Sequence, residues 1–269
     1  MRQGFASTSA RSSTPTIAEL RTATQPPSLF ERNSGEHWTG RLYMRRLSPY
    51  VTRLILPTSV SADAVTGATL VLGLAAAAVL TLPGLIPAGA AVVLIQLQML
   101  LDCSDGEIAR WRSEFSTRGI YLDRMSHYVT ETAFPIALGV RADGGWDALG
   151  GWTTLGAIVA VLVLMIRTES ALVHVARAES GKPLVIDTEE VAAPRGGALR
   201  RLRRAFRFVP FFRAFVAIEF TFLAFAAAVV DAIADDLTGT RVLLVALLPV
   251  AAVTALGHLV AILSSSRLR

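Results

Sequence analysis

The sequence has little of what a soluble or disulfide-stabilised protein needs. Its 269 residues include one cysteine, Cys103, which excludes an intrachain disulfide, and no Cys/His spacing typical of a zinc site is present. Charged residues make up 17% of the chain, against about 25% in soluble domains. Apolar residues reach 52%, and the mean hydropathy is +0.50. The composition therefore indicates an integral membrane protein.

Lysine is also nearly absent: Lys182 is the one lysine, arginine supplies the other cations, and the net charge is +5. A basic balance can indicate nucleic-acid binding. Here the arginine-rich run 200–207 directly precedes an apolar stretch, which favours attraction to anionic membrane lipids, so we expect no nucleic-acid partner. Arginine in place of lysine is typical of GC-rich bacterial genomes and favours a bacterial inner (plasma) membrane.

Six apolar stretches approach the roughly 20 residues that a helix needs to cross a bilayer. They lie at about 62–82, 86–101, 124–140, 152–166, 208–230 and 241–263. We therefore predict an all-α membrane domain of six transmembrane helices over residues 55–264. Residues 36–54 mix arginines with aromatic and aliphatic residues, which is typical of an amphipathic helix at the membrane interface. Residues 1–35 are expected to be disordered, and residues 265–269 to form a basic C-terminal tail.

Arginines gather in alternate loops of this predicted domain. They precede the first stretch, separate the second from the third and the fourth from the fifth, and close the chain, while the remaining loops are short or acidic. By the positive-inside rule, both termini face the cytoplasm. The loop between the second and third stretches, which carries the motif described next, faces the same side.

Acidic residues around this loop recur at helical spacing. Residues three, four and seven positions apart share one face of a helix. The first such stripe holds Asp102, Asp105 and Ala109, and the second holds Gly119, Asp123, His127 and Glu131. If the two helices pack as neighbours, the three aspartates converge. Ionised carboxylates repel one another, and a divalent cation relieves that repulsion, so the pattern predicts a site for Mg²⁺ or Mn²⁺.

Other residues of the stretch favour phosphoryl chemistry. Arg110, one turn beyond the first stripe, can bind a phosphate with its planar guanidinium. Gly106 and Gly119 lack side chains and let a ligand approach the backbone. His127 is a candidate base for an incoming hydroxyl, because histidine ordinarily titrates near neutral pH. Glu131, one turn later, could accept a hydrogen bond from the other ring nitrogen and set the tautomer.

The stretch closely resembles the signature of the CDP-alcohol phosphatidyltransferase family, D-x2-D-G-x2-A-R-x8-G-x3-D-x3-D. Seven of its eight positions match with every spacing intact: Asp102, Asp105, Gly106, Ala109, Arg110, Gly119 and Asp123. The eighth, an aspartate in the family, is His127 here. The resemblance extends to the six-span layout and the preceding interfacial helix.

This resemblance implies a metal-dependent enzyme. Such enzymes transfer a phospho-alcohol group, phosphatidyl or phosphopolyol, from a CDP-alcohol to the hydroxyl of an acceptor and release CMP, in phospholipid or phosphopolyol-lipid synthesis. The residues implied for two Mg²⁺ or Mn²⁺ ions are Asp102, Asp105, Asp123 and His127, of which Asp123 and His127 are also the catalytic candidates. The residues implied for the nucleotide are Gly106, Ala109, Arg110, Gly119 and, near the start of the first span, Thr66. A homodimer is expected by analogy.

Three further candidates lie at the cytoplasmic end of the fourth stretch. Arg167, His174 and Arg177 fall on roughly one helix face and could bind a phosphate of the acceptor alcohol. The alternative is an interfacial helix end whose arginines extend towards the lipid head groups.

Two other functions stay open at this point. A non-catalytic family member that binds a CDP-lipid or a partner would accommodate His127 in the signature. A membrane transporter with an interfacial acidic site would need charged residues near mid-span, whereas the acids here gather at one interface.

Overall fold

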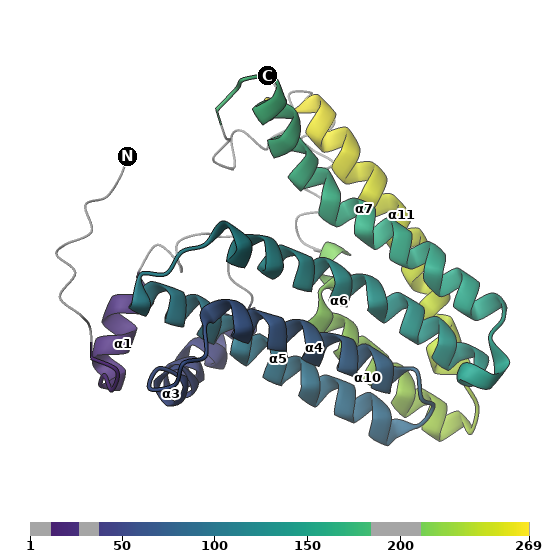
Figure 1. The fold of residues 1–269 in the computed structure, drawn as a ribbon. Coiled ribbons are helices and arrows are strands. Elements are labelled where there is room, and N and C mark those ends of the chain that lie inside the picture. Colours follow the sequence, from purple (N-terminus) through teal and green to yellow (C-terminus); the bar gives the residue numbers. More distant parts are fainter. Residues whose placement is uncertain (1–11, 27–37, 184–210, 269) are drawn as a thin grey trace. The chain divides into compact units, whose positions relative to one another are not determined.

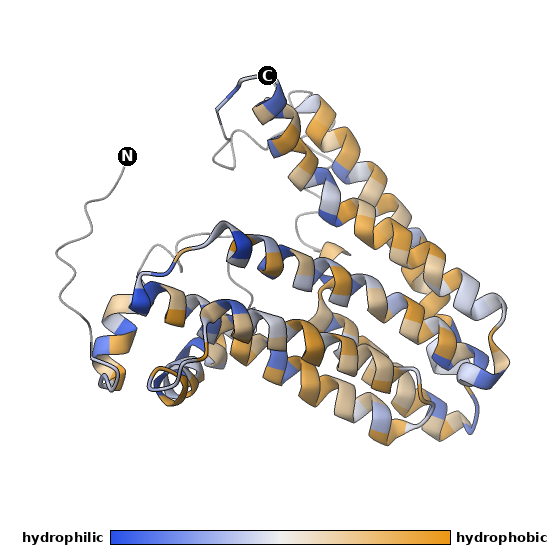
Figure 2. Ribbon diagram, viewed as in Figure 1, coloured by the Kyte–Doolittle hydropathy of each residue, from blue (hydrophilic) through white to orange (hydrophobic). Residues whose placement is uncertain are grey.

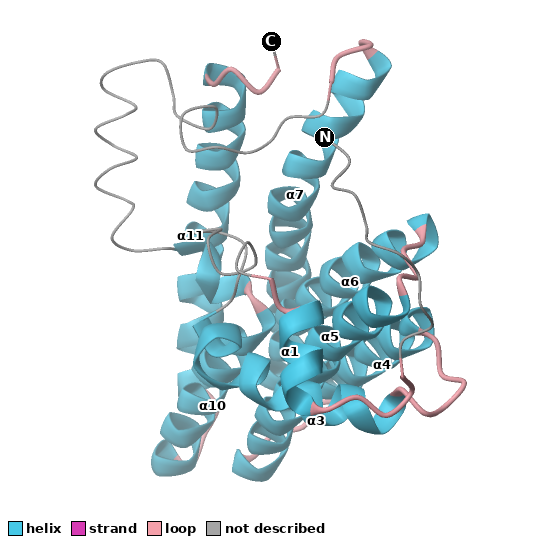
Figure 3. Cartoon of the chain, turned by 90° about the vertical axis from the view of Figure 1, so that its left-hand side faces the viewer, coloured by secondary structure: helices cyan, strands magenta, loops and turns pink. Residues whose placement is uncertain are grey.

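The computed structural model describes residues 12–26, 38–183 and 211–268, and every regular element among them is a helix (Figure 1, Figure 3). The all-α prediction is therefore confirmed. Five predicted features fall outside the described residues, in whole or in part. They are the basic run 200–207, the parts 1–11 and 27–35 of the segment expected to be disordered, residues 36–37 of the interfacial helix, residues 208–210 of the fifth span, and Arg269 of the basic tail.

Five described helices are long and apolar enough to cross a membrane. They are α4 (Ala62–Leu80), α5 (Leu85–Arg112), α7 (Gly151–Glu179), α10 (Ala217–Ala234) and α11 (Thr238–Ser264). Figure 2 shows long apolar stretches on α7 and α11. These five helices correspond to five of the six predicted spans and mark an integral membrane protein.

The remaining predicted span coincides with α6 (Thr117–Asp143), a helix of 27 residues. It is not among the helices apolar enough to cross a membrane, because ionisable side chains recur along its length, as its mixed colouring shows (Figure 2). The helix itself is confirmed. By length and composition, however, the described chain has five spans rather than the predicted six.

Two predicted boundaries also differ. The second span was expected to end at 101, but α5 continues to Arg112 and carries the first acidic stripe within one unbroken helix. The fifth was expected from 208, whereas α10 begins at Ala217, after the short 3₁₀ turn η3 (Phe211–Phe215). The backbone of Val216 is extended, and this residue separates the two elements.

Within the segment expected to be disordered, residues 17–24 form helix α1 (Ile17–Thr24). The Thr16 hydroxyl accepts a hydrogen bond from the backbone N–H of Glu19, and the Glu19 carboxylate accepts one from the backbone N–H of Thr16, which is a capping box. Leu20 is fully buried among apolar side chains of three other helices. An isolated helix of this length is marginal in water, so this contact, which local sequence does not reveal, stabilises it.

The predicted interfacial helix forms as η1 (Gly40–Met44), a π-helical turn that continues into α3 (Arg45–Ile55). Its polar Ser48 and Thr52 are buried, while Leu47, Tyr50 and Leu54 are exposed. Exposed apolar side chains among arginines are typical of a helix on a membrane surface. Its location at the interface stays a prediction.

The described chain divides into two compact units. The first comprises Met1–Gly73 and Gln96–His127 and so contains the whole motif, and the second comprises Leu74–Ile95 and Tyr128–Arg269. In the second unit, α11 packs against α7 and α10, and α6 connects to α7 through the 3₁₀ turn η2 (Trp146–Ala148). Gly139 lets α6 and α7 approach closely, since a Cβ there would lie 2.5 Å from the Trp152 carbonyl oxygen.

Candidate active site

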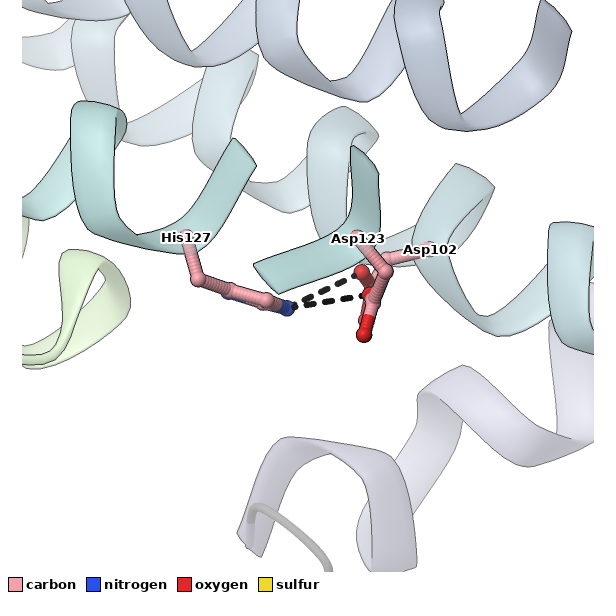
Figure 4. A group of neighbouring side chains, drawn as sticks. All are labelled: Asp102, Asp123 and His127. Atoms are coloured by element: carbon pink, nitrogen blue, oxygen red, sulfur yellow. Dashed lines mark ion pairs between the residues drawn. The ribbon is translucent and has the colours of Figure 1, made fainter. Parts of the chain in front are cut away.

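The motif brings three side chains of α5 and α6 together at one point of the first unit (Figure 4). His127 Nε2 lies 3.2 Å from Asp102 Oδ1 and 3.6 Å from Asp123 Oδ1. One ligand atom of each residue lies within 4.8 Å of those of the other two. We call Asp102, Asp123 and His127 the metal cluster. The predicted convergence of the two acidic stripes is thus realised for these three residues.

Local sequence fixes the turn that joins the two helices. Ser113 ends α5 with a positive φ of 57°, and Ser116 begins α6 by accepting a 2.7 Å hydrogen bond from the backbone N–H of Gly119. The Arg112 guanidinium donates hydrogen bonds to three carbonyl oxygens of the turn that precedes α4, those of Leu56, Thr58 and Val60. These contacts secure the ends of the helices that carry the metal cluster.

The side chains of the metal cluster are accessible to solvent, and its two carboxylates repel each other. The side-chain exposed fraction is 23% for Asp102, 49% for Asp123 and 40% for His127, so a ligand can reach all three. Burial and the neighbouring Asp102 carboxylate raise the pKa of Asp123, while His127 acts in the opposite direction. A divalent cation would relieve the repulsion between the carboxylates. Two carboxylates and one imidazole nitrogen are donors that could hold a divalent metal ion.

Asp105, the third aspartate predicted to bind metal, does not belong to this cluster. It is 8% exposed, and its Oδ2 accepts a 2.6 Å hydrogen bond from the buried Thr66 hydroxyl of α4. The structure therefore gathers three of the four predicted ligands. Thr66, predicted to bind the nucleotide, is a hydrogen-bond donor to Asp105, and both assigned roles stay predictions.

The two predicted nucleotide-site glycines pack against side chains of the protein itself. A Cβ on Gly106 would lie 3.2 Å from both Nη1 and Nη2 of Arg110, which therefore folds back over the glycine. A Cβ on Gly119 would lie 2.7 Å from Asp63 Oδ1. Ala109, between them in the chain, packs against the apolar cluster around Leu20. Lack of a side chain thus has a structural reason here, in addition to the predicted approach of a ligand.

Sequence analysis missed Glu107, which lies inside the motif and is fully buried. Its carboxylate accepts hydrogen bonds from Ser48 Oγ (2.5 Å), Thr52 Oγ1 (2.7 Å) and Gln25 Nε2 (2.8 Å). Glu107 therefore joins α3 and the segment after α1 to α5. One feature of the sequence could have indicated this contact: Ser48 and Thr52 are hydroxyl residues four positions apart on a helix that is otherwise mainly apolar and basic.

Of the predicted acceptor-binding residues, all on α7, the two arginines have structural partners in the second unit. Arg167 forms an ion pair with Glu131, which was predicted instead to orient His127. Arg177 donates hydrogen bonds to the carbonyl oxygens of Pro183 (2.8 Å) and Arg267 (2.9 Å). His174 Nδ1 is buried and has no hydrogen-bond partner among the described residues. Their binding of an acceptor stays a prediction.

A family model described as CDP-alcohol phosphatidyltransferase matches residues 59–202. The match covers more than half of the chain and includes α4, α5, α6, α7 and every residue of the motif. No curated protein matches the chain.

Proposed function

Because the chain belongs to the CDP-alcohol phosphatidyltransferase family, we propose that it transfers a phospho-alcohol group from a CDP-alcohol to an acceptor hydroxyl and releases CMP. The acceptor oxygen forms a bond to the phosphorus that carries the donor alcohol, and the bond from that phosphorus to the CMP oxygen breaks. The acceptor's proton passes to a base. The observation that carries this proposal is the meeting of Asp102, Asp123 and His127 at one solvent-accessible point.

The metal cluster would hold a divalent cation, Mg²⁺ or Mn²⁺. Asp102 and Asp123 offer the hard oxygen donors that both ions prefer, and His127 offers a nitrogen that Mn²⁺ accepts more readily than Mg²⁺. The family resemblance implies a second ion, with Asp105 among its ligands. Held by these residues, such cations would supply positive charge that stabilises the attacking and leaving oxygens of a phosphoryl transfer.

His127 Nε2 has one lone pair, so it cannot bind a cation and accept a proton at the same time. It faces both carboxylates of the metal cluster, and we assign it to the cation. The proton then goes to Asp123, the most exposed member of the cluster, whose Oδ1 faces His127 and whose second oxygen can take the proton from the acceptor hydroxyl.

Arg110 and Gly106 would receive the diphosphate of the CDP-alcohol. The two terminal nitrogens of Arg110 lie together over Gly106, one turn from the metal cluster along α5. A planar guanidinium can donate two parallel hydrogen bonds to phosphate oxygens. We place this chemistry at the cytoplasmic face of the membrane because of the distribution of arginines, and in a bacterial inner membrane because the chain uses arginine in place of lysine.

The test is CMP release by the purified full chain in detergent. CDP-diacylglycerol and a panel of CDP-polyols serve as donors, with phosphorylated and unphosphorylated alcohols as acceptors, and Mg²⁺, Mn²⁺ or EDTA in parallel. We expect at least one pair to release CMP only with an acceptor and a metal. Asp102→Asn and Asp123→Asn should each lower that rate by about a hundredfold or more.

Asp147→Asn is the matched control, because Asp147 is an exposed carboxylate of the second unit, and it should keep the wild-type rate. Turnover that persists in EDTA or in the asparagine variants would refute the proposal. Metal-dependent CDP binding without turnover of any pair would favour the non-catalytic family member.

A further inference from the structure

Helix α1, which lies beside α3 (Figure 1), is attached to the part of α5 that carries the motif. Leu20 is completely buried in an apolar cluster that includes Ile108 and Trp111 of α5. Ahead of the helix, Trp111 Nε1 donates a 3.1 Å hydrogen bond to the carbonyl oxygen of Ser12. The segment is therefore held to α5 at its beginning and through its middle.

The C-terminal end of α1 contacts the motif directly. The Thr24 carbonyl oxygen accepts a 2.6 Å hydrogen bond from Arg110 Nε. The next residue, Gln25, donates from Nε2 to Glu107 Oε1 and to the Arg45 carbonyl oxygen, both at 2.8 Å. The last carbonyls of a helix lack partners within it and carry partial negative charge, so they are good acceptors for a guanidinium.

This contact determines where the rest of the Arg110 side chain lies. A guanidinium is rigid and planar, so a hydrogen bond that fixes Nε also restricts the direction of Nη1 and Nη2. Those two nitrogens lie over Gly106, each 3.2 Å from the position that a Cβ would occupy. An arginine held in this way loses less conformational freedom when it binds an anion.

We propose that α1 is part of the nucleotide site and that its C-terminal carbonyl positions Arg110 for the diphosphate of the CDP-alcohol. Thr24 and Gln25 act as positioning residues, and Leu20 keeps the helix docked. This inference rests on the proposed function, because that function assigns the diphosphate to Arg110. It goes beyond that function by giving residues 12–26, which precede the matched family region, a role in donor binding.

The first experiment compares Leu20→Asp with Ala18→Asp in the full chain. Both place a carboxylate on α1, but Leu20 is buried and Ala18 is exposed. The probe is CDP with Mn²⁺, measured by calorimetry, together with KM and kcat for CMP release. Leu20→Asp should weaken CDP binding about tenfold, the size expected for one hydrogen bond to a charged group. KM should rise more than kcat falls, and Ala18→Asp should bind CDP like the wild type.

A double-mutant cycle separates positioning from a general loss of structure. Arg110→Lys keeps the charge but has no Nε–H, so undocking α1 in that background should change CDP affinity less than about twofold. If Leu20→Asp does not fold, Gln25→Ala takes its place in the cycle and should weaken CDP binding in the same direction. Effects that add fully in the double variant would overturn the proposal.

Two other outcomes would also overturn it. CDP affinity unchanged by Leu20→Asp would mean that α1 does not serve the site, and tighter CDP binding would mean that α1 obstructs it. Failure of the proposed function is recognised separately, because it is judged by wild-type turnover and by Asp102→Asn. An enzyme that turns over, depends on Asp102 and is indifferent to Leu20→Asp would refute only the role of α1.

Discussion

The Thr66 hydroxyl donates a 2.6 Å hydrogen bond to Asp105 Oδ2, 39 residues further along the chain. Both residues are buried, and the bond joins α4 to the middle of the motif on α5. Asp105 therefore has a donor from the protein itself at one carboxylate oxygen, while Asp102, one turn earlier, faces His127. Two aspartates of one signature thus occupy different environments.

Thr66→Val should destabilise the protein by about 1–3 kcal/mol, because it removes the donor without changing the side-chain shape and leaves a buried carboxylate oxygen unpaired. Thr66→Ser keeps the hydroxyl and is the matched control. Thermal unfolding of both variants in the same detergent measures the difference. Equal stability of the valine and serine variants would mean that the bond is unimportant for Asp105.

Two substitutions test whether His127 binds the metal ion or is a replacement of the family's aspartate that has no role in the site. His127→Ala should lower CMP release by about tenfold or more, since it removes one donor of the metal cluster. His127→Asp supplies an oxygen donor instead, so activity should persist with the ratio of Mg²⁺-supported to Mn²⁺-supported rates increased. The measurement is CMP release against the concentration of each metal. A fully active alanine variant would exclude His127 from the site.

The elements that sequence predicted well are those specified by local pattern. Apolar runs located α4, α5, α7 and α11, and residue spacing alone placed Asp102, Asp123 and His127 on facing helix stripes. The length of an apolar segment is enough to locate a membrane-spanning helix. Residue spacing is enough to show which side chains share a face of that helix. Two such faces meet only if their helices are neighbours. The same reasoning overestimated the hydropathy of α6. This helix is long enough to cross a membrane, but its ionisable residues make it too polar to count among the candidate spans.

What sequence did not predict depends on contacts between distant segments. Helix α1 needs the pocket around Leu20, which residues from α3 to α5 complete. The Glu107 carboxylate accepts hydrogen bonds from two residues of α3, which lie more than fifty positions away in the sequence, and from Gln25. Glu131 pairs with Arg167 on the next helix, a partner that its four-residue step after His127 did not indicate, and its predicted role towards His127 stays a prediction. Spacing along one helix does not identify partners on another.

Among the arginines of the second unit that the structure describes, Arg141 should be the most costly to remove. It is fully buried, lies 3.6 Å from Asp231, and donates to the carbonyl oxygens of Leu82 and Gly84. Arg141→Ala leaves a buried carboxylate without its cation, a loss of about 3–5 kcal/mol. Arg118→Ala, which removes an 81% exposed partner of Asp63, should cost at most about 1 kcal/mol.

The joint variant Arg141→Met with Asp231→Leu tests the same argument from the other side. It removes both charges and replaces them with apolar volume, so it should recover most of the stability lost in Arg141→Ala. Thermal unfolding measures all three variants. If the double variant is no more stable than the single one, then hydrogen bonds rather than the charge pair stabilise this region, namely those of Arg141 to the backbone and those that Asp231 accepts from Thr240.

Glu107→Gln tests whether the buried carboxylate holds α3 and the segment after α1 against α5. Glutamine keeps the shape but offers one acceptor oxygen and an NH₂ group, so it cannot accept from Ser48, Thr52 and Gln25 as the carboxylate does. Unfolding should become easier by about 1–3 kcal/mol. Because Gln25 follows α1 directly, amide hydrogen exchange over residues 17–24 should also quicken. Glu114→Gln, at an exposed position in the turn that follows α5, should alter neither quantity. If exchange over α1 is unchanged although the protein is less stable, then Glu107 stabilises α3 on α5 and the docking of α1 depends on Leu20 alone.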